Sequence, residues 1–369
     1  MGMTLPRLYN VIGLMSGTSL DGVDVALVET DGLAHVRPKG FAYFPYPESL
    51  RAKVRACFGA RAKTADIEDA EHELTIAHIN AVKQFMAAES LTPADIDLIG
   101  FHGQTITHDP DHGFTWQLGA GDLLARETGV NVVYDFRTAD VAAGGQGAPL
   151  IPIYHWARAF SSHVTFPVAI LNIGGVSNVT WLGKTEGELL AFDCGPGNAL
   201  IDDVVLKATG ARFDKDGAIA LSGKADPEIL SRWLSHPFFQ KRPPKSLDRG
   251  AWDTKTISNL PLADAVATLT DFTVAAIAQG ATYFPEPATA WYVTGGGRLN
   301  TAIMQGLRAR LKCSVEPVEA LGWDGDALEA EGFAYLAVRS VLGLPLSYPT
   351  TTGIKRAITG GKIVYEKNK

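Results

Sequence analysis

The chain has 369 residues, of which 46% are hydrophobic and 20% are charged, a composition typical of a globular protein long enough for two cores. Its formal net charge is -7 and its basic residues form no block, which argues against nucleic acid as the main partner. A membrane-spanning run of about 18 apolar residues is absent, as is a secretory signal. The three cysteines form no CxxC pair, which favours a reducing compartment. We therefore expect a cytoplasmic protein.

The first part of the chain predicts strands and helices in alternation. Apolar, β-prone runs and helical spacing, with Thr64 as a helix cap, mark the elements. Strands are expected at 9–14, 23–28, 96–101 and 131–135, and helices at 64–89 and 121–127, followed by the glycine-rich run AAGGQGAP.

A second cycle begins near residue 168 and resembles the first in the order of its elements. Both cycles open with a strand, a turn of small residues and a returning strand, and both later have a strand that ends in a small polar loop. This order predicts two similar α/β lobes with a cleft between them. We expect an N-terminal lobe at 1–140 and a C-terminal lobe at 141–369, whose tail is able to pack back on the first. Strands are expected at 168–173, 179–182, 189–192 and 291–293, and helices at 199–208 and 326–341.

The stretch from Gly13 to Asp24, GLMSGTSLDGVD, joins the first two predicted strands. Glycine lets a ligand approach the backbone closely, and the N–H and hydroxyl groups of residues 17–19 suit phosphate oxygens. The Asp21 carboxylate stands where it can hold Mg²⁺ through water. A plain polar hairpin turn explains the same residues, because Asp-Gly is a common turn pair. Both interpretations stay open on this stretch alone.

Asp193 follows an apolar strand and precedes Cys-Gly-Pro-Gly-Asn and a predicted helix. A carboxylate at the end of such a strand points into the crevice of an α/β sheet and can act as a general base. The alternative is a helix cap, the commonest role of Asp before a helix. The inserted Gly-Pro-Gly makes a plain cap less favoured.

Three further loops are candidates for ligand contact. The stretches NIGGVSN (172–178) and TGGGR (294–298) place glycines at strand ends, where a flat ring or phosphate can lie against the backbone, although turns need no ligand. The third, HGQT, begins at His102 and is followed by His108 and His112. The spacing of these histidines matches no usual zinc pattern, so hydrogen bonding to substrate or backbone is favoured over a metal.

Two enzyme classes lack their signatures. No GxxxxGK[ST] motif is present, which excludes a Walker-type phosphate loop. No GxSxG motif is present either, so serine hydrolase chemistry has no support.

Seven stretches taken together resemble the anhydro-N-acetylmuramic acid kinase family, a member of the hexokinase, Hsp70 and actin superfamily. They occur in order along nearly the whole chain, and their combination is specific. One departure is Cys194, where we expect threonine; it adjoins Asp193 without replacing it. The stretches are GLMSGTSLDGVDVAL (13–27), FHGQTI (101–106), DFRTADVAAGGQGAPL (135–150), LNIGGVSNVT (171–180), FDCGPGNALID (192–202), TGGGRLN (294–300) and DALEAEGFAYLA (326–337).

The resemblance implies two actin/hexokinase-like lobes with mixed sheets flanked by helices and an active-site cleft between the lobes. It implies ATP and Mg²⁺, and as substrate 1,6-anhydro-N-acetylmuramic acid, an amino sugar of peptidoglycan recycling. Water would attack C1, the 1,6-anhydro bond would open, and O6 would take the γ-phosphoryl group. The products would be N-acetylmuramic acid 6-phosphate and ADP.

Site residues are implied in the same way. Asp193 is the expected catalytic base and Asp21 the expected metal-binding residue. Arg137 is expected to grip the lactyl carboxylate of the sugar, although a salt bridge with Asp135 or Asp140 is an alternative. The remaining substrate-binding residues are His102, Gln104, Gly197 and Asn198. ATP binding is implied for Gly17, Thr18, Ser19, Leu20, Asp21, Gly22, Val23, Asp24, Asn172, Gly174, Gly175, Gly295, Gly296 and Gly297.

Two alternative functions remain open on the sequence. One is a kinase of another sugar in the same superfamily, which tests with glucose or N-acetylmuramic acid distinguish. The other is a non-catalytic nucleotide-binding switch on the same fold, which would leave Asp193 and the HGQT loop without a role. The expected partners are the sugar and ATP, with no nucleic acid and no membrane, and the expected assembly is a homodimer.

Overall fold

The computed structural model describes residues 7–17, 19–247 and 252–366, and the chain forms two compact units. Unit 1 is Met1–His163 with Ala327–Lys369, and unit 2 is Val164–Asp326. The chain therefore passes from unit 1 to unit 2 beyond the junction expected near residue 140. Residues 141–163 stay with unit 1 because helix α5 (Pro152–Ser161) is tied to it: Ser161 donates a hydrogen bond to the Ala34 carbonyl, and Tyr154 donates one to Glu331.

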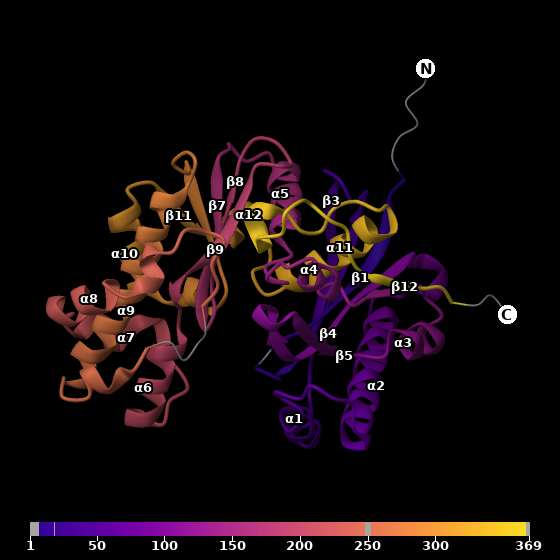
Figure 1. Ribbon diagram of the computed structural model, residues 1–369, viewed down its shortest axis with the longest axis horizontal. Coiled ribbons are helices and arrows are strands. Elements are labelled where there is room, and N and C mark those ends of the chain that lie inside the picture. The colour runs from indigo at the N-terminus through magenta and orange to yellow at the C-terminus, as the bar shows by residue number, and fades with distance from the viewer. Residues whose placement is uncertain (1–6, 18, 248–251, 367–369) are drawn as a thin grey trace. The chain divides into compact units, whose positions relative to one another are not determined.

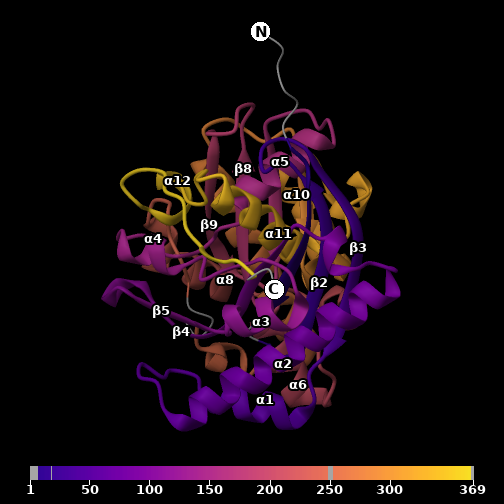
Figure 2. The same cartoon turned by 90° about the vertical axis from the view of Figure 1, so that its right-hand side faces the viewer.

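Unit 1 is built on a seven-stranded mixed sheet (Figures 1 and 2). The order is β12-β6-β4-β1-β2-β3, and β5 pairs with β4. The central strand β1 is antiparallel to β2 and parallel to β4, and β4 is parallel to β6. The strands are β1 (Tyr9–Ser16), β2 (Gly22–Thr30), β3 (Val36–Pro45), β4 (Leu98–Asp109), β5 (Phe114–Leu118), β6 (Val132–Tyr134) and β12 (Lys362–Val364).

Unit 2 repeats this strand order in a five-stranded sheet, β11-β10-β7-β8-β9. Its central strand β7 is antiparallel to β8 and parallel to β10, as β1 is to β2 and β4. The expected pair of similar α/β lobes is therefore confirmed. The strands are β7 (Val168–Ile173), β8 (Val176–Leu182), β9 (Leu189–Pro196), β10 (Ala290–Thr294) and β11 (Ser314–Pro317).

Helices cover both faces of the unit 1 sheet. Successive residues of β1 point to opposite faces, and both faces are packed against helices. Ile12 and Leu14 pack into a core that includes residues of α2 (Ala65–Ala88). Gly13 faces the other way, against α11 (Leu328–Val341), so closely that a Cβ on Gly13 would lie 1.9 Å from the Ala330 carbonyl oxygen. Thr64 caps α2 by accepting a hydrogen bond from the Ile67 N–H, as the sequence predicts. The remaining helices of unit 1 are α1 (Glu48–Arg55), α3 (Gly121–Thr128), α4 (Thr138–Ala142) and α12 (Pro349–Thr352).

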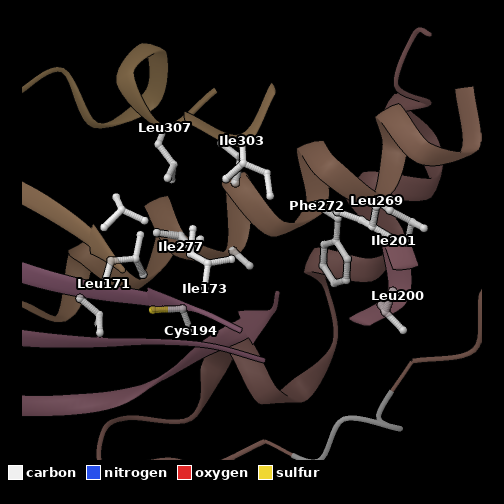
Figure 3. Packing of buried hydrophobic residues seen from close by; sticks show 14 of the residues in the cluster. Leu171, Ile173, Cys194, Leu200, Ile201, Leu269, Phe272, Ile277, Ile303 and Leu307 are labelled. Atoms are coloured by element: carbon white, nitrogen blue, oxygen red, sulfur yellow. The ribbon is translucent and has the colours of Figure 1, made fainter. Parts of the chain in front are cut away.

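The core of unit 2 lies between its sheet and helices α9 (Leu262–Gly280) and α10 (Thr301–Leu311). Figure 3 shows Leu171 and Ile173 of β7 facing Ile277 of α9 and Ile303 and Leu307 of α10. Burial of such apolar side chains is the main stabilising contribution to a domain of this size. The remaining helices of unit 2 are α6 (Ala199–Thr209), α7 (Ala218–Ser222) and α8 (Pro227–Leu234).

The predicted elements are present with shifts of a few residues, except at the ends of two strands. The strand expected at 96–101 continues as β4 to Asp109, so the HGQT stretch at 102–105 lies within a strand and not in a loop after one. The second exception is β9. The sequence places the end of this strand at residue 192, but β9 continues to Pro196. A β-bulge at Cys194 of β9 leaves this residue without a partner, and Asp193 and Gly195 on either side of it pair with Asn178 and Ser177 of β8. Asp193 therefore lies within a strand, not in a loop after one. No helix of the described residues is long and apolar enough to cross a membrane.

Candidate active site

The turn between β1 and β2 exposes few of the residues expected to bind phosphate. Ser19 and Asp21 are exposed, and a Cβ on Gly17 would meet only the Ser19 hydroxyl, at 3.6 Å. Leu20 and Val23, by contrast, are buried in the unit 1 core, so only their backbone is available to a ligand. Thr18 lies outside the described residues. Among its described residues, the exposed part of the turn offers backbone groups, the Ser19 hydroxyl and the Asp21 carboxylate to an anion or a cation.

Gly22 and Gly13 are glycines for reasons of packing. A Cβ on Gly22 would lie 2.2 Å from the carbonyl oxygen of Phe44 on β3, and Gly13 is pressed against α11. At these two positions glycine lets two elements of the protein pack closely, and no ligand is needed to explain it. Gly17, in contrast, has open space around it.

A buried chain of hydrogen bonds joins this turn to the HGQT stretch of β4. Ser16, at the end of β1, donates to Gln104 Oε1 at 2.6 Å, and the Tyr46 hydroxyl donates to Ser16 Oγ at 2.9 Å. His78 of α2 lies behind Tyr46, with its Nε2 3.5 Å from the phenolic oxygen. Gln104 is fully buried and points at Ser16. Tyr46 and His78 carry no signal in the sequence, because their link to the turn exists only in the folded protein.

His102 and Arg137 form a second polar pair in unit 1. Arg137 donates through Nε to His102 Nε2 at 2.9 Å, and through Nη1 to the Gly147 carbonyl at 2.7 Å. Because arginine only donates, Nε2 of His102 carries no proton, and its Nδ1–H donates to the Gly103 carbonyl at 2.7 Å. Burial, reinforced by the Arg137 charge, holds the pKa of His102 well below its usual range, so the ring is neutral.

The alternative salt bridges of Arg137 are not the ones formed. Asp135 pairs with Lys362, and Asp140 accepts hydrogen bonds from the Gly147 N–H and the Thr352 hydroxyl. Asp140 and Arg137 thus hold the loop at Gly147 from two sides. Burial lowers the pKa of Arg137 to about 10, which leaves the guanidinium charged at neutral pH. Within the described residues its other N–H groups make no further hydrogen bond, although the charge of Glu329 also acts on the guanidinium.

The three histidines of this region have separate roles. His102 pairs with Arg137, while His108 contacts Thr115 and the Gln146 carbonyl, and His112 contacts Asp109. Among the described residues no group of three or more His, Cys, Asp or Glu side chains is arranged to hold a metal ion. His102 borders a pocket of about 240 Å³ that Trp116 and Lys362 also line.

In unit 2, the half-buried Asp193 is held by the segment 245–247. Its Oδ2 accepts a hydrogen bond from the Leu247 N–H at 2.7 Å, and its own N–H donates to the Lys245 carbonyl at 3.0 Å. Burial raises the pKa of Asp193 to about 6, against the lowering effects of the Leu247 hydrogen bond and the Lys245 charge. The helix-cap alternative does not hold, since Asn198 occupies the cap position of α6.

Three loops of unit 2 meet beside one another at the strand ends. Asn198 donates to the carbonyls of Ile173 and Gly174 at 2.9 and 3.2 Å, which joins the 197–198 loop to the 172–175 loop. Gly295 adopts φ +72°, and a Cβ there would lie 2.3 Å from Oδ1 of Asn172. The structure therefore brings together glycines that are far apart in sequence.

Not all of these glycines are open to a ligand. Gly175 and Gly296 are exposed, and an added Cβ would meet nothing closer than 3.5 and 3.8 Å respectively. Gly297, in contrast, is buried, with a Cβ position 2.4 Å from Ile173, and Gly197 is similarly close to the Gly174 carbonyl. Gly174 is half-buried, but its Cβ position is also open, with the nearest atom at 3.8 Å, so Gly174, Gly175 and Gly296 form the part of the cluster that a flat ring or a phosphate can approach.

Lys245 is the residue of unit 2 that sequence reasoning missed. It is 9% exposed, and its Nζ lies 4.4 Å from the centre of the Phe238 ring and 4.8 Å from that of Tyr283. Only the motif PPKS, a lysine after two prolines, marks it in the sequence.

Comparisons with known proteins identify the relatives of this chain. The model of the anhydro-N-acetylmuramic acid kinase family matches residues 9–366. Anhydro-N-acetylmuramic acid kinase of Rhizorhabdus wittichii is 49% identical over 95% of this chain and 97% of its own, and that of Zymomonas mobilis is 48% identical over 96% and 99%.

Solved structures also match, at much lower identity. The activator of 2-hydroxyisocaproyl-CoA dehydratase from Clostridium difficile, with bound ADPNP, covers 90% of this chain and 97% of its own at 12% identity and a TM-score of 0.46. A ROK family glucokinase from Streptomyces griseus in complex with glucose and AMPPNP covers 89% and 98% at 14% identity and a TM-score of 0.42.

Proposed function

Because the chain belongs to the anhydro-N-acetylmuramic acid kinase family, we propose that it phosphorylates 1,6-anhydro-N-acetylmuramic acid with ATP and opens the anhydro ring in the same reaction. Water attacks C1, the bond between C1 and O6 breaks, and O6 takes the γ-phosphoryl group. The products are N-acetylmuramic acid 6-phosphate and ADP, and the reaction serves peptidoglycan recycling. The proposal takes the chain to act as a homodimer, which sedimentation of the purified protein checks.

The observation that carries this proposal is the environment of Asp193. A general base works best when its pKa lies near the working pH, and burial raises the pKa of Asp193 to about 6. Its Oδ2 is fixed by the Leu247 N–H, while the side chain keeps part of its surface exposed. Asp193 takes the proton of the attacking water. The O6 that leaves C1 is itself the nucleophile toward phosphorus, so a single base serves both steps.

The glycine loops of unit 2 are proposed to bind the nucleotide. Gly175 and Gly296 leave their backbone exposed, and Asn198 fixes the loop that contains Gly174. The turn of unit 1, through Gly17, Ser19 and the backbone of its neighbours, is proposed to contact the phosphates. Backbone N–H groups suit this role in an acidic protein, because they bind phosphate without adding lysines.

Mg²⁺ is proposed to use Asp21. The carboxylate is 48% exposed, its nearest ion-pair atom is Arg51 Nη2 at 3.8 Å, and it is therefore able to take a hydrated cation. Such a site fits Mg²⁺, which usually binds one or two carboxylates together with substrate phosphates. When bound, the ion would neutralise charge on the transferring phosphoryl group.

The sugar is proposed to contact the residues of unit 1 around Arg137. The lactyl carboxylate of the substrate is an anion, and among the described residues Arg137 uses only Nε and Nη1 for hydrogen bonds, to His102 and Gly147. His102, neutral and buried, orients the guanidinium. Gln104 is fully buried and accepts a hydrogen bond from Ser16, so we propose that it supports the sugar site without contacting the sugar through an exposed surface.

A coupled assay of ADP release tests the proposed function. The protein is incubated with ATP, Mg²⁺ and either 1,6-anhydro-N-acetylmuramic acid, N-acetylmuramic acid, glucose or no sugar. ADP should appear with the anhydro sugar, and mass spectrometry should show one phosphorylated, ring-opened product per ADP. Release with glucose alone would move the assignment to another sugar kinase. Nucleotide binding without any sugar-dependent release would favour a non-catalytic switch.

A further inference from the structure

The ammonium group of Lys245 lies inside a cage of aromatic rings. Its Nζ is within cation–π range of four ring centres: Phe238 at 4.4 Å, Tyr283 at 4.8 Å, Phe192 at 5.8 Å and Phe239 at 6.0 Å. It also donates to the Phe238 carbonyl at 3.3 Å. A buried lysine is uncommon unless it has such partners, and among the described residues the hydrogen bond of this ammonium goes to a backbone carbonyl.

The cage places this cation next to the proposed base. Phe192 is a wall of the cage and immediately precedes Asp193 in β9. The backbone of Lys245 accepts the hydrogen bond of the Asp193 N–H, and Leu247, two residues on, donates to the Asp193 carboxylate. One short segment therefore carries both the hydrogen-bond donor and the positive charge that favour the ionised carboxylate.

The other titratable groups near this pair do not supply a competing charge. Cys194 follows Asp193, and burial, with the neighbouring carboxylate, raises the pKa of its thiol so that it stays neutral. The Tyr283 hydroxyl donates to the Phe239 carbonyl. Across the ladder from Asp193 on β8 stands the neutral Asn178. Within the described residues, the charge that acts on Asp193 is that of Lys245.

We propose that Lys245 is a positioning residue for the reaction: its caged ammonium keeps the Asp193 carboxylate ionised and holds the segment 245–247 against it. The inference rests on the proposed role of Asp193 as the base. A lysine that only fills an aromatic pocket would matter to stability but not to the ionisation of Asp193. The two roles are separated by the pH dependence of turnover, which a purely structural lysine would not move.

The test is the pH profile of kcat/KM for the anhydro sugar, which reports ionisations of the free enzyme. In Lys245→Met, a neutral side chain of similar length remains in the cage. The acid limb should move to higher pH by on the order of one unit, because a nearby opposite charge has been removed. Lys245→Arg, which keeps the charge, should keep the limb near its wild-type position. The matched control is Lys241→Met, an exposed lysine four residues before Lys245, which should leave the profile unchanged.

Two outcomes overturn the proposal: an unmoved acid limb in a folded Lys245→Met protein, or an equal displacement in Lys245→Arg. Should Lys245→Met turn over too slowly to profile, carbon NMR of aspartate-labelled protein gives the Asp193 titration directly, with Asp193→Asn identifying the signal. Failure of the base assignment itself gives a different result, since Asp193→Asn would then keep near-normal turnover whatever Lys245 does.

Discussion

Arg137 donates a hydrogen bond through Nε to Nε2 of His102 at 2.9 Å, and this pair fixes the protonation of the histidine. The imidazole is locked in the tautomer that carries its proton on Nδ1, and its pKa is held well below the usual range. The consequence is a guanidinium oriented from one side by a neutral ring and from the other by the Gly147 carbonyl. An oriented guanidinium with free donors suits a carboxylate, which it can bind in a bidentate manner.

Arg137→Ala should raise KM for 1,6-anhydro-N-acetylmuramic acid by roughly 10- to 100-fold, the usual worth of a hydrogen bond to a charged group, and leave KM for ATP unchanged. Arg137→Lys should recover little of this loss, because lysine lacks the planar fork. The decisive comparison uses 1,6-anhydro-N-acetylglucosamine, which lacks the lactyl group. An equal penalty on both sugars would show that Arg137 does not read the carboxylate.

Gly13 in β1 and Gly17 in the turn after it should respond differently to replacement by alanine. Gly13→Ala should lower the free energy of unfolding by about 3 kcal/mol or more, because the new Cβ would lie 1.9 Å from the Ala330 carbonyl oxygen. Gly17→Ala should change stability by no more than about 0.5 kcal/mol, since its Cβ position is open. It should instead raise KM for ATP. Urea denaturation midpoints and steady-state kinetics of both variants check this, and a stable Gly13→Ala protein would contradict the packing explanation.

Asp21→Asn should increase the Mg²⁺ concentration needed for half-maximal activity and leave KM for the sugar unchanged. The reason is that an amide is a weaker ligand for a hard cation than a carboxylate. The matched control is Glu48→Gln, which removes the other exposed carboxylate that pairs with Arg51. If both variants keep the wild-type Mg²⁺ titration, the turn at Asp21 is a hairpin without a metal role.

Elements that depend on local pattern were predictable from the sequence. The helix expected at 64–89 is α2, Ala65–Ala88, because a long apolar period and the Thr64 cap are both encoded locally. The repeated strand order of the two sheets likewise follows from two cycles of strand, turn and strand. Such signals need no knowledge of distant residues.

Features that depend on distant partners were not predictable. The Gly-Pro-Gly after Asp193 signals a turn, yet β9 runs on to Pro196, because a bulge at Cys194 lets the residues beyond it pair with Ser177 and Val176 of β8. The cage of Lys245 draws its rings from residues 192, 238, 239 and 283, which only the folded unit brings together. Gly22 has a packing reason to be glycine that the sequence does not show, because a Cβ there would lie 2.2 Å from the Phe44 carbonyl of β3; its role in ATP binding stays a prediction.

Asp193→Asn should lower kcat by roughly 10²- to 10⁴-fold, the usual cost of losing a positioned general base, while ATP binding persists. Asparagine keeps an oxygen that can accept the Leu247 hydrogen bond, so the fold should survive. The matched control is Asp216→Asn, at an exposed position with φ +57° that asparagine also adopts readily. Calorimetric titration with a non-hydrolysable ATP analogue separates loss of chemistry from loss of binding.

The pH profile gives the same assignment an independent check. A base is active when deprotonated, so in the wild type kcat/KM should rise with pH through the Asp193 pKa of about 6 and fall tenfold per unit below it. The residual activity of Asp193→Asn should lack this limb, because asparagine does not titrate. An acid limb that persists at the same pH in Asp193→Asn would assign the ionisation to another group. Near-normal turnover in that variant would remove Asp193 from the mechanism.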